Sequence, residues 1–224
     1  MLLISLIIIV SGCAPAYIPN VINAPLLNNK NEFQGAINVG ASGFDPQFSY
    51  ALTDHIGLMM NGCFSNSDPS IKSSSYNKHQ FYEFGAGYFT RDKNNLLFEV
   101  YGGAGFGTFN SKYSYNLWTD HVDLKTRRLF LQPTVGITLK FVDLSFSTRL
   151  VHLNLEQGNL YLNTFFYEPA FTFKVGPKYL KYIIQISGSD PIAKSNTGLS
   201  RIMMSMGLQF NFGKKDNLAP ANKH

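Results

Sequence analysis

Residues 129–141 alternate between two kinds of side chain, and this alternation limits the fold more than any other feature of the chain. The odd positions, from Leu129 to Phe141, are all apolar, whereas the even positions after Phe130 are Gln, Thr, Gly, Thr and Lys. A period of two places one set on each face of a β-strand, while a helix would spread the same apolar residues all round its axis. The stretch therefore predicts a long strand whose two faces meet different surroundings.

The same pattern recurs along most of the chain, and no stretch shows a convincing helical period. Ten strands are expected, near residues 32–41, 44–52, 56–65, 79–91, 95–109, 124–140, 142–153, 163–175, 179–188 and 199–212. Tight turns at 53–55, 92–95, 140–143 and 176–178 alternate with longer polar loops at 66–78, 110–123, 154–162 and 189–198, after a short first connection at 41–43.

This order of strands and connections is typical of a barrel that crosses a membrane. Outer-membrane barrels have an even number of antiparallel strands, with tight turns on the periplasmic side and longer loops outside. A strand of about ten residues tilted by about 45° crosses the hydrocarbon core, and closure pairs every backbone group, as lipid demands. The sequence therefore predicts an all-β fold, a closed antiparallel up-and-down transmembrane β-barrel of about 10 strands, with eight or twelve left open.

The composition fits a barrel whose polar face is enclosed. Only 15% of the residues are Asp, Glu, Lys or Arg, against about 25% in an ordinary soluble domain. The mean hydropathy of −0.05 excludes a bundle of transmembrane helices. The polar face carries Gly, Ser, Thr, Gln and Asn, so we expect it to line a lumen while the apolar face meets lipid. The basic residues behind the net charge of +5 are scattered, which gives nucleic-acid binding little support.

The N-terminus has the features of an export signal. Residues 1–10 are apolar except Ser5, a run too short to span a bilayer but of the length of a signal-peptide core. Three prolines follow Cys13 within a few residues, which favours an extended chain. We expect a signal peptide at 1–12, an extended tether between anchor and barrel at 13–31, the barrel at 32–212 and a polar tail at 213–224.

Several segments together resemble a known family. The sequence Val-Ser-Gly-Cys ending at Cys13 resembles the lipobox of bacterial lipoproteins. With the Asn-Ala-Pro-Leu-Leu stretch from Asn23, the strand pair 47–64 and the final strand ending at Phe212, the chain resembles lipid-anchored outer-membrane barrels of Bacteroidota-type bacteria. The resemblance implies cleavage before Cys13, acylation of that cysteine and periplasmic N- and C-termini. It also implies outer-membrane lipids and the barrel-assembly and lipoprotein-export machineries as partners, and it names no activity.

The chain offers no convincing catalytic constellation, so we do not expect an enzyme. His121 stands between Asp120 and Asp123, but this spacing is not specific for any chemistry. No His or Cys pair has the spacing of metal ligands, and neither a metal nor a cofactor is expected. Cys63 is expected on the inward face of its strand as a small packing residue.

Charged side chains on the polar face form the one remaining cluster, made of Glu83, Glu99, Arg149 and Glu168. Barrels of eight strands are filled by side chains and those of sixteen hold a channel, so at ten strands we expect a salt-bridged plug rather than a selectivity lining.

The expected function is a structural, binding or accessory role in the outer membrane, with a protein partner left open. The recognition surface would be formed by aromatic residues of two outer loops, namely Tyr76, Tyr113, Tyr115 and Trp118. A narrow porin-like pore for small solutes or ions is one alternative, and a soluble lipocalin-like periplasmic carrier tethered by its lipid is another.

Overall fold

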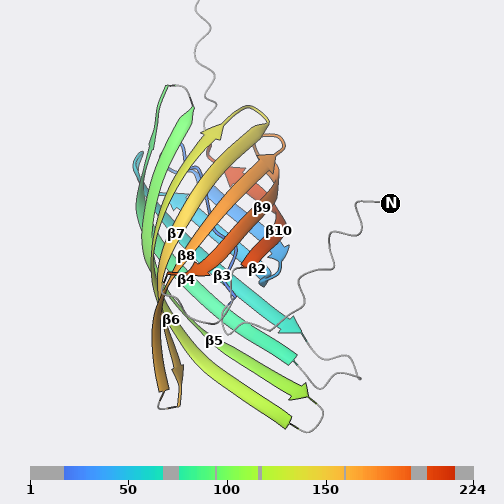
Figure 1. The fold of residues 1–224 in the computed structure, drawn as a ribbon. Helices are drawn as coiled ribbons and strands as arrows, with labels where there is room; N and C mark the ends of the chain where they lie inside the picture. Colours follow the sequence, from blue (N-terminus) through green and yellow to red (C-terminus); the bar gives the residue numbers. More distant parts are fainter. Residues whose placement is uncertain are drawn as a thin grey trace, which may run out of the picture.

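The computed structural model describes residues 18–67, 76–93, 95–115, 118–158, 160–192 and 201–214. Their strands form one closed barrel (Figure 1). The strands are β1 (Phe33–Gly40), β2 (Gly43–Ala51), β3 (Ile56–Ser67), β4 (Tyr76–Arg91), β5 (Leu96–Tyr115), β6 (Trp118–Thr138), β7 (Val142–Gln157), β8 (Leu160–Val175), β9 (Leu180–Pro191) and β10 (Arg201–Phe212). No helix in the described part of the chain is long and apolar enough to cross a membrane.

Each strand pairs antiparallel with its neighbours in sequence, and β1 pairs with β10 to close the barrel. At this seam Phe33 lies opposite Phe212 and Gly40 lies opposite Ser205. In the barrel body closure leaves no free sheet edge, so the backbone of each strand has a partner strand on both sides. Beyond the body, residues 118–124 of β6 pair with β5 alone. The predicted count of ten strands and the up-and-down order are confirmed.

The two ends of the barrel differ, and each has a set of connections. We call one the tight-turn end, where bends at 52–55, 92–95, 139–141 and 176–179 join the strands and where β1 begins and β10 ends. The other is the loop end, which holds the connections 41–42, 68–75, 116–117, 158–159 and 193–200. The predicted tight turns are confirmed. Residues 68–75, 94, 116–117, 159 and 193–200 lie outside the described residues.

The expected loop at 110–123 is wrong, because β5 and β6 continue through it as a paired hairpin. Their ladder runs from Leu96 opposite Ile137 to Tyr115 opposite Trp118. In Figure 1 this hairpin projects below the barrel body. The outward residues also change character along it: Leu129 on β6 is apolar, whereas Lys125 and Arg127 are charged and exposed. Both faces of the projecting part carry polar residues, so the alternation that predicted the strands fades although backbone pairing continues.

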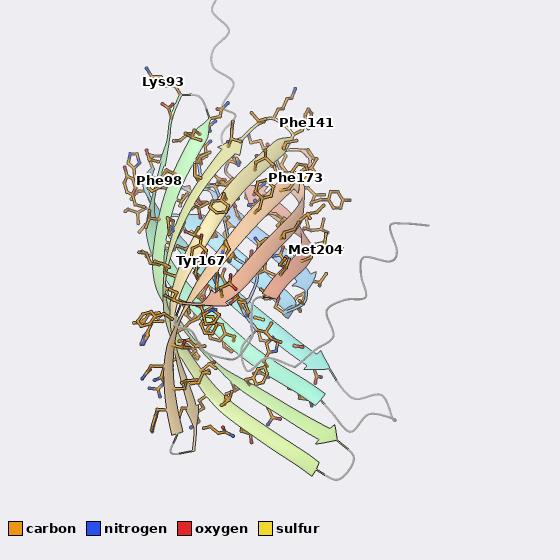
Figure 2. All side chains as sticks on the ribbon, viewed as in Figure 1. Lys93, Phe98, Phe141, Tyr167, Phe173 and Met204 are labelled. Atoms are coloured by element: carbon orange, nitrogen blue, oxygen red, sulfur yellow. The ribbon has the colours of Figure 1, made fainter. Side chains whose placement is uncertain are left out.

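The outer face of the barrel body is apolar. Leu129 on β6 is 59% exposed, Phe106 on β5 57% and Phe171 on β8 49%. Figure 2 shows side chains such as Phe98, Phe141 and Tyr167 on the outside of the wall. On β5 this apolar belt runs from Leu96 to Phe106, about 33 Å along the strand and about 23 Å along the axis at a tilt of about 45°. Membrane barrels carry an apolar band of about 25 Å.

Glycines on β5 make room for large aromatic side chains inside the wall. A Cβ atom at Gly105 would lie 2.5 Å from the Phe81 ring, and one at Gly103 would lie 2.5 Å from the Phe130 ring. Both rings are buried. The glycines on β5 therefore leave space next to the wall for these bulky lumen residues.

Residues 18–29 run through the lumen, and we call them the plug segment. Ile18 lies near the loop end, where it lines a small cavity with His79 and Phe109. At the tight-turn end, Asn29 donates a hydrogen bond of 2.9 Å to the carbonyl oxygen of Gly213. The expectation of a linker that joins anchor and barrel at 13–31 therefore does not hold from residue 18 onward, because the segment lies inside the barrel. Residues 18–29 form neither a helix nor a strand, and the apolar side chains from Val21 to Leu27 are buried among polar lumen residues.

The described chain therefore starts and ends at opposite ends of the barrel. Ten strands alone would return the chain to the side where it began, as we expected. The plug segment adds one crossing inside the lumen, so Ile18 and Gly213 lie at opposite ends. The expected placement of both termini on one side does not hold for these two residues. Residues 1–17, with Cys13, and the tail from 215 lie outside the described residues.

Candidate functional site

The most organised polar site of the molecule is the lumen, where side chains of the wall bind the backbone of the plug segment. The Gln185 amide on β9 accepts a hydrogen bond from the Ile22 N–H at 2.9 Å and donates one to the Ile22 carbonyl at 2.8 Å. Two side chains of β2 bind the neighbouring residue, Val21. Its N–H donates to Asp45 at 3.2 Å, and Gln47 donates to its carbonyl at 2.8 Å. Wall side chains thus replace the strand partners that the segment lacks.

Further along, one carboxylate binds two successive backbone groups. Glu99 on β5 is fully buried and accepts hydrogen bonds from the N–H groups of Leu26 at 3.2 Å and Leu27 at 2.8 Å. Both leucines are fully buried, and Leu27 packs in an apolar cluster with Ala51 and Phe89. This contact fixes the plug segment where it leaves the lumen.

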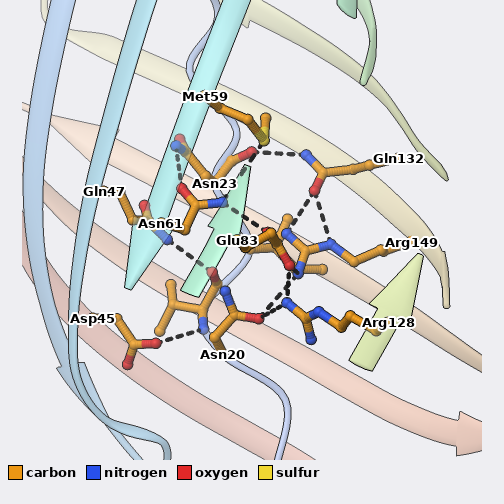
Figure 3. A network of polar contacts seen from close by, with 12 residues as sticks. Asn20, Asn23, Asp45, Gln47, Met59, Asn61, Glu83, Arg128, Gln132 and Arg149 are labelled. Carbon is orange, nitrogen blue, oxygen red and sulfur yellow. Dashed lines mark hydrogen bonds and ion pairs between the residues drawn. The ribbon is translucent and has the colours of Figure 1, made fainter. Parts of the chain in front are cut away.

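A charged network occupies the lumen closer to the loop end (Figure 3). Glu83 on β4 forms an ion pair with Arg128 on β6 and a second with Arg149 on β7, the latter at 3.6 Å between Oε2 and Nη1. The Asn20 side-chain oxygen accepts hydrogen bonds from both guanidinium groups. Arg149 also donates to Gln132 from Nε at 3.0 Å and from Nη2 at 2.7 Å. Buried charges are tolerated only when paired and hydrogen-bonded in this way.

Asn23 connects this network to the opposite wall. Its side-chain amide donates to Ser49 at 3.1 Å and to Asn61 at 2.8 Å, and Asn61 in turn donates to Glu83 at 2.8 Å. Gln132 donates to the Asn23 carbonyl at 2.7 Å. Asn23 therefore binds β2, β3 and β6 directly, and its partners Asn61 and Gln132 extend the network to β4 and β7.

A second charged group lies towards the tight-turn end. Lys174 on β8 donates to the Ala24 carbonyl at 2.6 Å and to Gln209 on β10 at 2.8 Å. Next to it, Lys181 on β9 forms an ion pair with Asp143 on β7 at 2.7 Å. All the side chains of this group are buried.

The four charged residues expected to share the lumen all lie inside the wall, but they are not one cluster. Glu83 and Arg149 form an ion pair, and Glu168 on β8 lies opposite Arg149 in the ladder. Glu99 lies apart from them and accepts hydrogen bonds from the backbone N–H groups of Leu26 and Leu27. Sequence reasoning missed Arg128, although it shares the inward parity of Phe130. It also missed Asn20, for which a proline-rich extended segment gives no periodic signal.

The four aromatic recognition candidates are strand residues rather than loop residues. Tyr76 is the first residue of β4, Tyr115 the last of β5 and Trp118 the first of β6. Tyr113 pairs with Asp120 in the β5–β6 ladder. All four therefore belong to the loop end, where β4, β5 and β6 extend beyond the apolar belt.

A small cavity lies between the start of the plug segment and the wall. It is lined by Ile18, Cys63, His79 and Arg128 and has a volume of about 30 Å³, room for about two water molecules. Cys63 is buried, as expected, with its sulfur 3.3 Å from His79 Nε2. Within the described ranges, no three His, Cys, Asp or Glu side chains are arranged to hold a metal ion.

Comparison with known proteins gives structural likeness only. No family model matches the chain, and no curated protein matches it. The translocator domain of the autotransporter NalP from Neisseria meningitidis is similar with a TM-score of 0.46 and 7% identity, over 81% of this chain and 86% of that one. The N-terminal β-barrel domain of Pseudomonas aeruginosa OprF has a TM-score of 0.36 and 12% identity, over 83% and 100%. Ail, the attachment invasion locus protein of Yersinia pestis, has a TM-score of 0.34 and 11% identity, over 82% and 99%.

Proposed function

We propose that this protein is a lipid-anchored outer-membrane barrel with a closed lumen and a structural, binding or accessory role. The observation that carries the proposal is the plug segment, whose backbone is bound from several strands by side chains such as Gln185 and Glu99. A lumen built to hold a segment of its own chain is not available to a solute.

The apolar belt supports the membrane location over the soluble carrier. A soluble barrel buries its apolar face and shows charges to water, whereas this one buries Glu83, Arg149 and Lys174 and exposes rings such as Phe106 and Phe171. An exposed apolar surface of this extent marks an interaction with lipid or protein. We expect that only detergent extracts the full chain and that the chain shows heat-modifiable migration on gels. Release by salt or carbonate would contradict the membrane location.

The pore alternative conflicts with the packing of the lumen, and planar bilayers test it. The purified full chain is expected to give no discrete conductance. Gln185→Leu combined with Glu99→Gln weakens the hold on Ile22, Leu26 and Leu27, and is expected to give brief openings as the plug segment leaves. Heat-modifiable migration checks that both proteins are folded. Stable single channels from the unaltered protein would overturn the proposal of a closed lumen.

The binding or accessory role is proposed for the part of β4, β5 and β6 that projects at the loop end. From Phe106 to Tyr115 the hairpin continues for about 30 Å along the strand. A photo-crosslinking residue at Tyr113 or Trp118 in living cells is expected to capture a partner. The same residue at Tyr179, exposed at the tight-turn end, serves as the control. Equal adducts at Tyr113, Trp118 and Tyr179, or none at all, would count against a recognition surface there.

The lipid anchor is proposed for Cys13 on the strength of its lipobox-like sequence. Metabolic labelling with palmitate is expected in the full chain and not in Cys13→Ser. Equal labelling of the two proteins would overturn the anchor and leave the barrel unaffected.

A further inference from the structure

The direction of the plug segment determines where the chain before it begins. Ile18 shares its cavity with Phe109 on β5, whereas Leu26 and Leu27 bind Glu99 on the same strand. These two positions on β5 are about 33 Å apart along the strand, or about 23 Å along the axis at a tilt of about 45°. The segment therefore enters the lumen at the loop end and leaves it at the tight-turn end.

The reach of the chain then limits the position of Cys13. Cys13 lies five positions before Ile18, and an extended chain covers at most about 3.6 Å per position, or about 18 Å. That length is shorter than the path back to the tight-turn end.

The orientation of the barrel assigns a side of the membrane to each end. Barrels of this type place their tight turns in the periplasm and their longer connections outside. The tight-turn end holds the end of β10, and the loop end holds the projecting β5–β6 hairpin. The loop end is thus the outer end.

We infer that the acylated Cys13 lies on the outer face of the outer membrane, with the plug segment threaded through the barrel and the C-terminal end of β10 in the periplasm. This inference rests on the proposed lipid anchor. It replaces a periplasmic anchor by a surface anchor: the acyl chains would insert into the outer leaflet beside the loop end.

Single cysteines labelled with a membrane-impermeant maleimide on intact cells test the inference. The parent is Cys63→Ala, in which the acylated Cys13 thiol does not react. Ala16→Cys reports on the N-terminal side. Gln157→Cys, exposed at the loop end, and Lys93→Cys, exposed at the tight-turn end, are the two controls.

Ala16→Cys is expected to label on intact cells to the same extent as Gln157→Cys, with no increase on permeabilisation, while Lys93→Cys labels only after permeabilisation. An Ala16→Cys that behaves as Lys93→Cys would overturn the threaded topology. Labelling of Lys93→Cys but not Gln157→Cys on intact cells would overturn the orientation and with it the surface anchor. Palmitate labelling is a separate measurement: if the parent carries no palmitate and its Cys13 reacts with maleimide, the lipid anchor fails while the threading result stands.

Discussion

The side chain of Gln185 binds both backbone groups of Ile22, accepting from its N–H at 2.9 Å and donating to its carbonyl at 2.8 Å. The two residues are 163 positions apart in the sequence. A neighbouring strand would normally provide this pair of bonds. A single glutamine provides them here because the plug segment runs inside the barrel with no strand beside it.

Replacing this glutamine tests how much the plug segment contributes to stability. Gln185→Leu keeps the volume but leaves the Ile22 N–H and carbonyl without partners. An unsatisfied buried group costs about 1–3 kcal/mol, so the loss of both partners is expected to lower the free energy of unfolding by about 2–6 kcal/mol. Urea unfolding in detergent, followed by heat-modifiable migration, measures it. Gln157→Leu at the exposed end of β7 is the matched control and should change little. Equal stability of the two variants would contradict a bound plug segment.

Loss of the buried ion pairs is also expected to lower the free energy of unfolding. Glu83→Gln removes the charge that pairs with Arg128 and Arg149 and leaves two guanidinium groups buried. Breaking a buried pair in this way costs about 3–5 kcal/mol. The same urea titration measures the loss.

Two variants separate the charge effect from a general disturbance. Glu83→Gln combined with Arg128→Met is expected to recover part of the loss, because one uncompensated charge is gone. Glu156→Gln, on the partly exposed rim of β7, should stay near the unaltered protein. A double variant less stable than Glu83→Gln alone by the full cost of a second substitution would show that the charges are not coupled.

The part of the plug segment nearest the tight-turn end makes an apolar contact that can be tested separately. Leu27 is fully buried against Ala51 and Phe89. Leu27→Ala is therefore expected to lower the free energy of unfolding by about 2–5 kcal/mol, as large-to-small core substitutions do. Leu52→Ala, at a 50% exposed position in the adjacent turn, is the control. If residues 13–31 were a free tether, neither substitution would change the free energy of unfolding.

The glycines of β5 predict that alanine substitutions at two positions three residues apart differ in their effect on stability. A Cβ at Gly105 would lie 2.5 Å from the Phe81 ring, whereas one at Gly102 would have no atom nearer than 3.8 Å. Gly105→Ala is expected to destabilise the barrel by about 1–3 kcal/mol through overpacking, and Gly102→Ala to be tolerated. Folding yields in detergent and urea midpoints compare the two. A Phe81→Leu substitution should relieve part of the Gly105→Ala defect; no relief would mean that the backbone contacts, not the ring, cause it.

The sequence was informative wherever the two faces of a strand meet different surroundings. Along β6 the contrast between lipid and lumen gives Leu129 and Leu131 on one face and Gln132 and Thr134 on the other, and the parity is correct. Where β5 and β6 project past the belt, both faces carry polar residues, so the sequence pattern predicts a loop from Asn110 onward although the strand continues to Tyr115.

The contents of the lumen were harder to predict. Parity placed Glu83, Glu99, Arg149 and Glu168 inside, but which of them meet depends on the register and the curvature of the barrel. The plug segment had no periodic pattern at all. Its partners, such as Gln185, are far away in the sequence, and its prolines indicate only an extended chain.

The filled lumen also constrains the order of assembly. Wall side chains such as Asp45, Glu99 and Gln185 are buried with the backbone of the plug segment as their partner. Arg128 and Arg149 likewise share the Asn20 side-chain oxygen as an acceptor. A seam that closed before the segment entered would leave these lumen groups without those partners. We therefore expect the residues before β1 to take their place while β1 and β10 are still apart, and the pairing of Phe33 with Phe212 to follow.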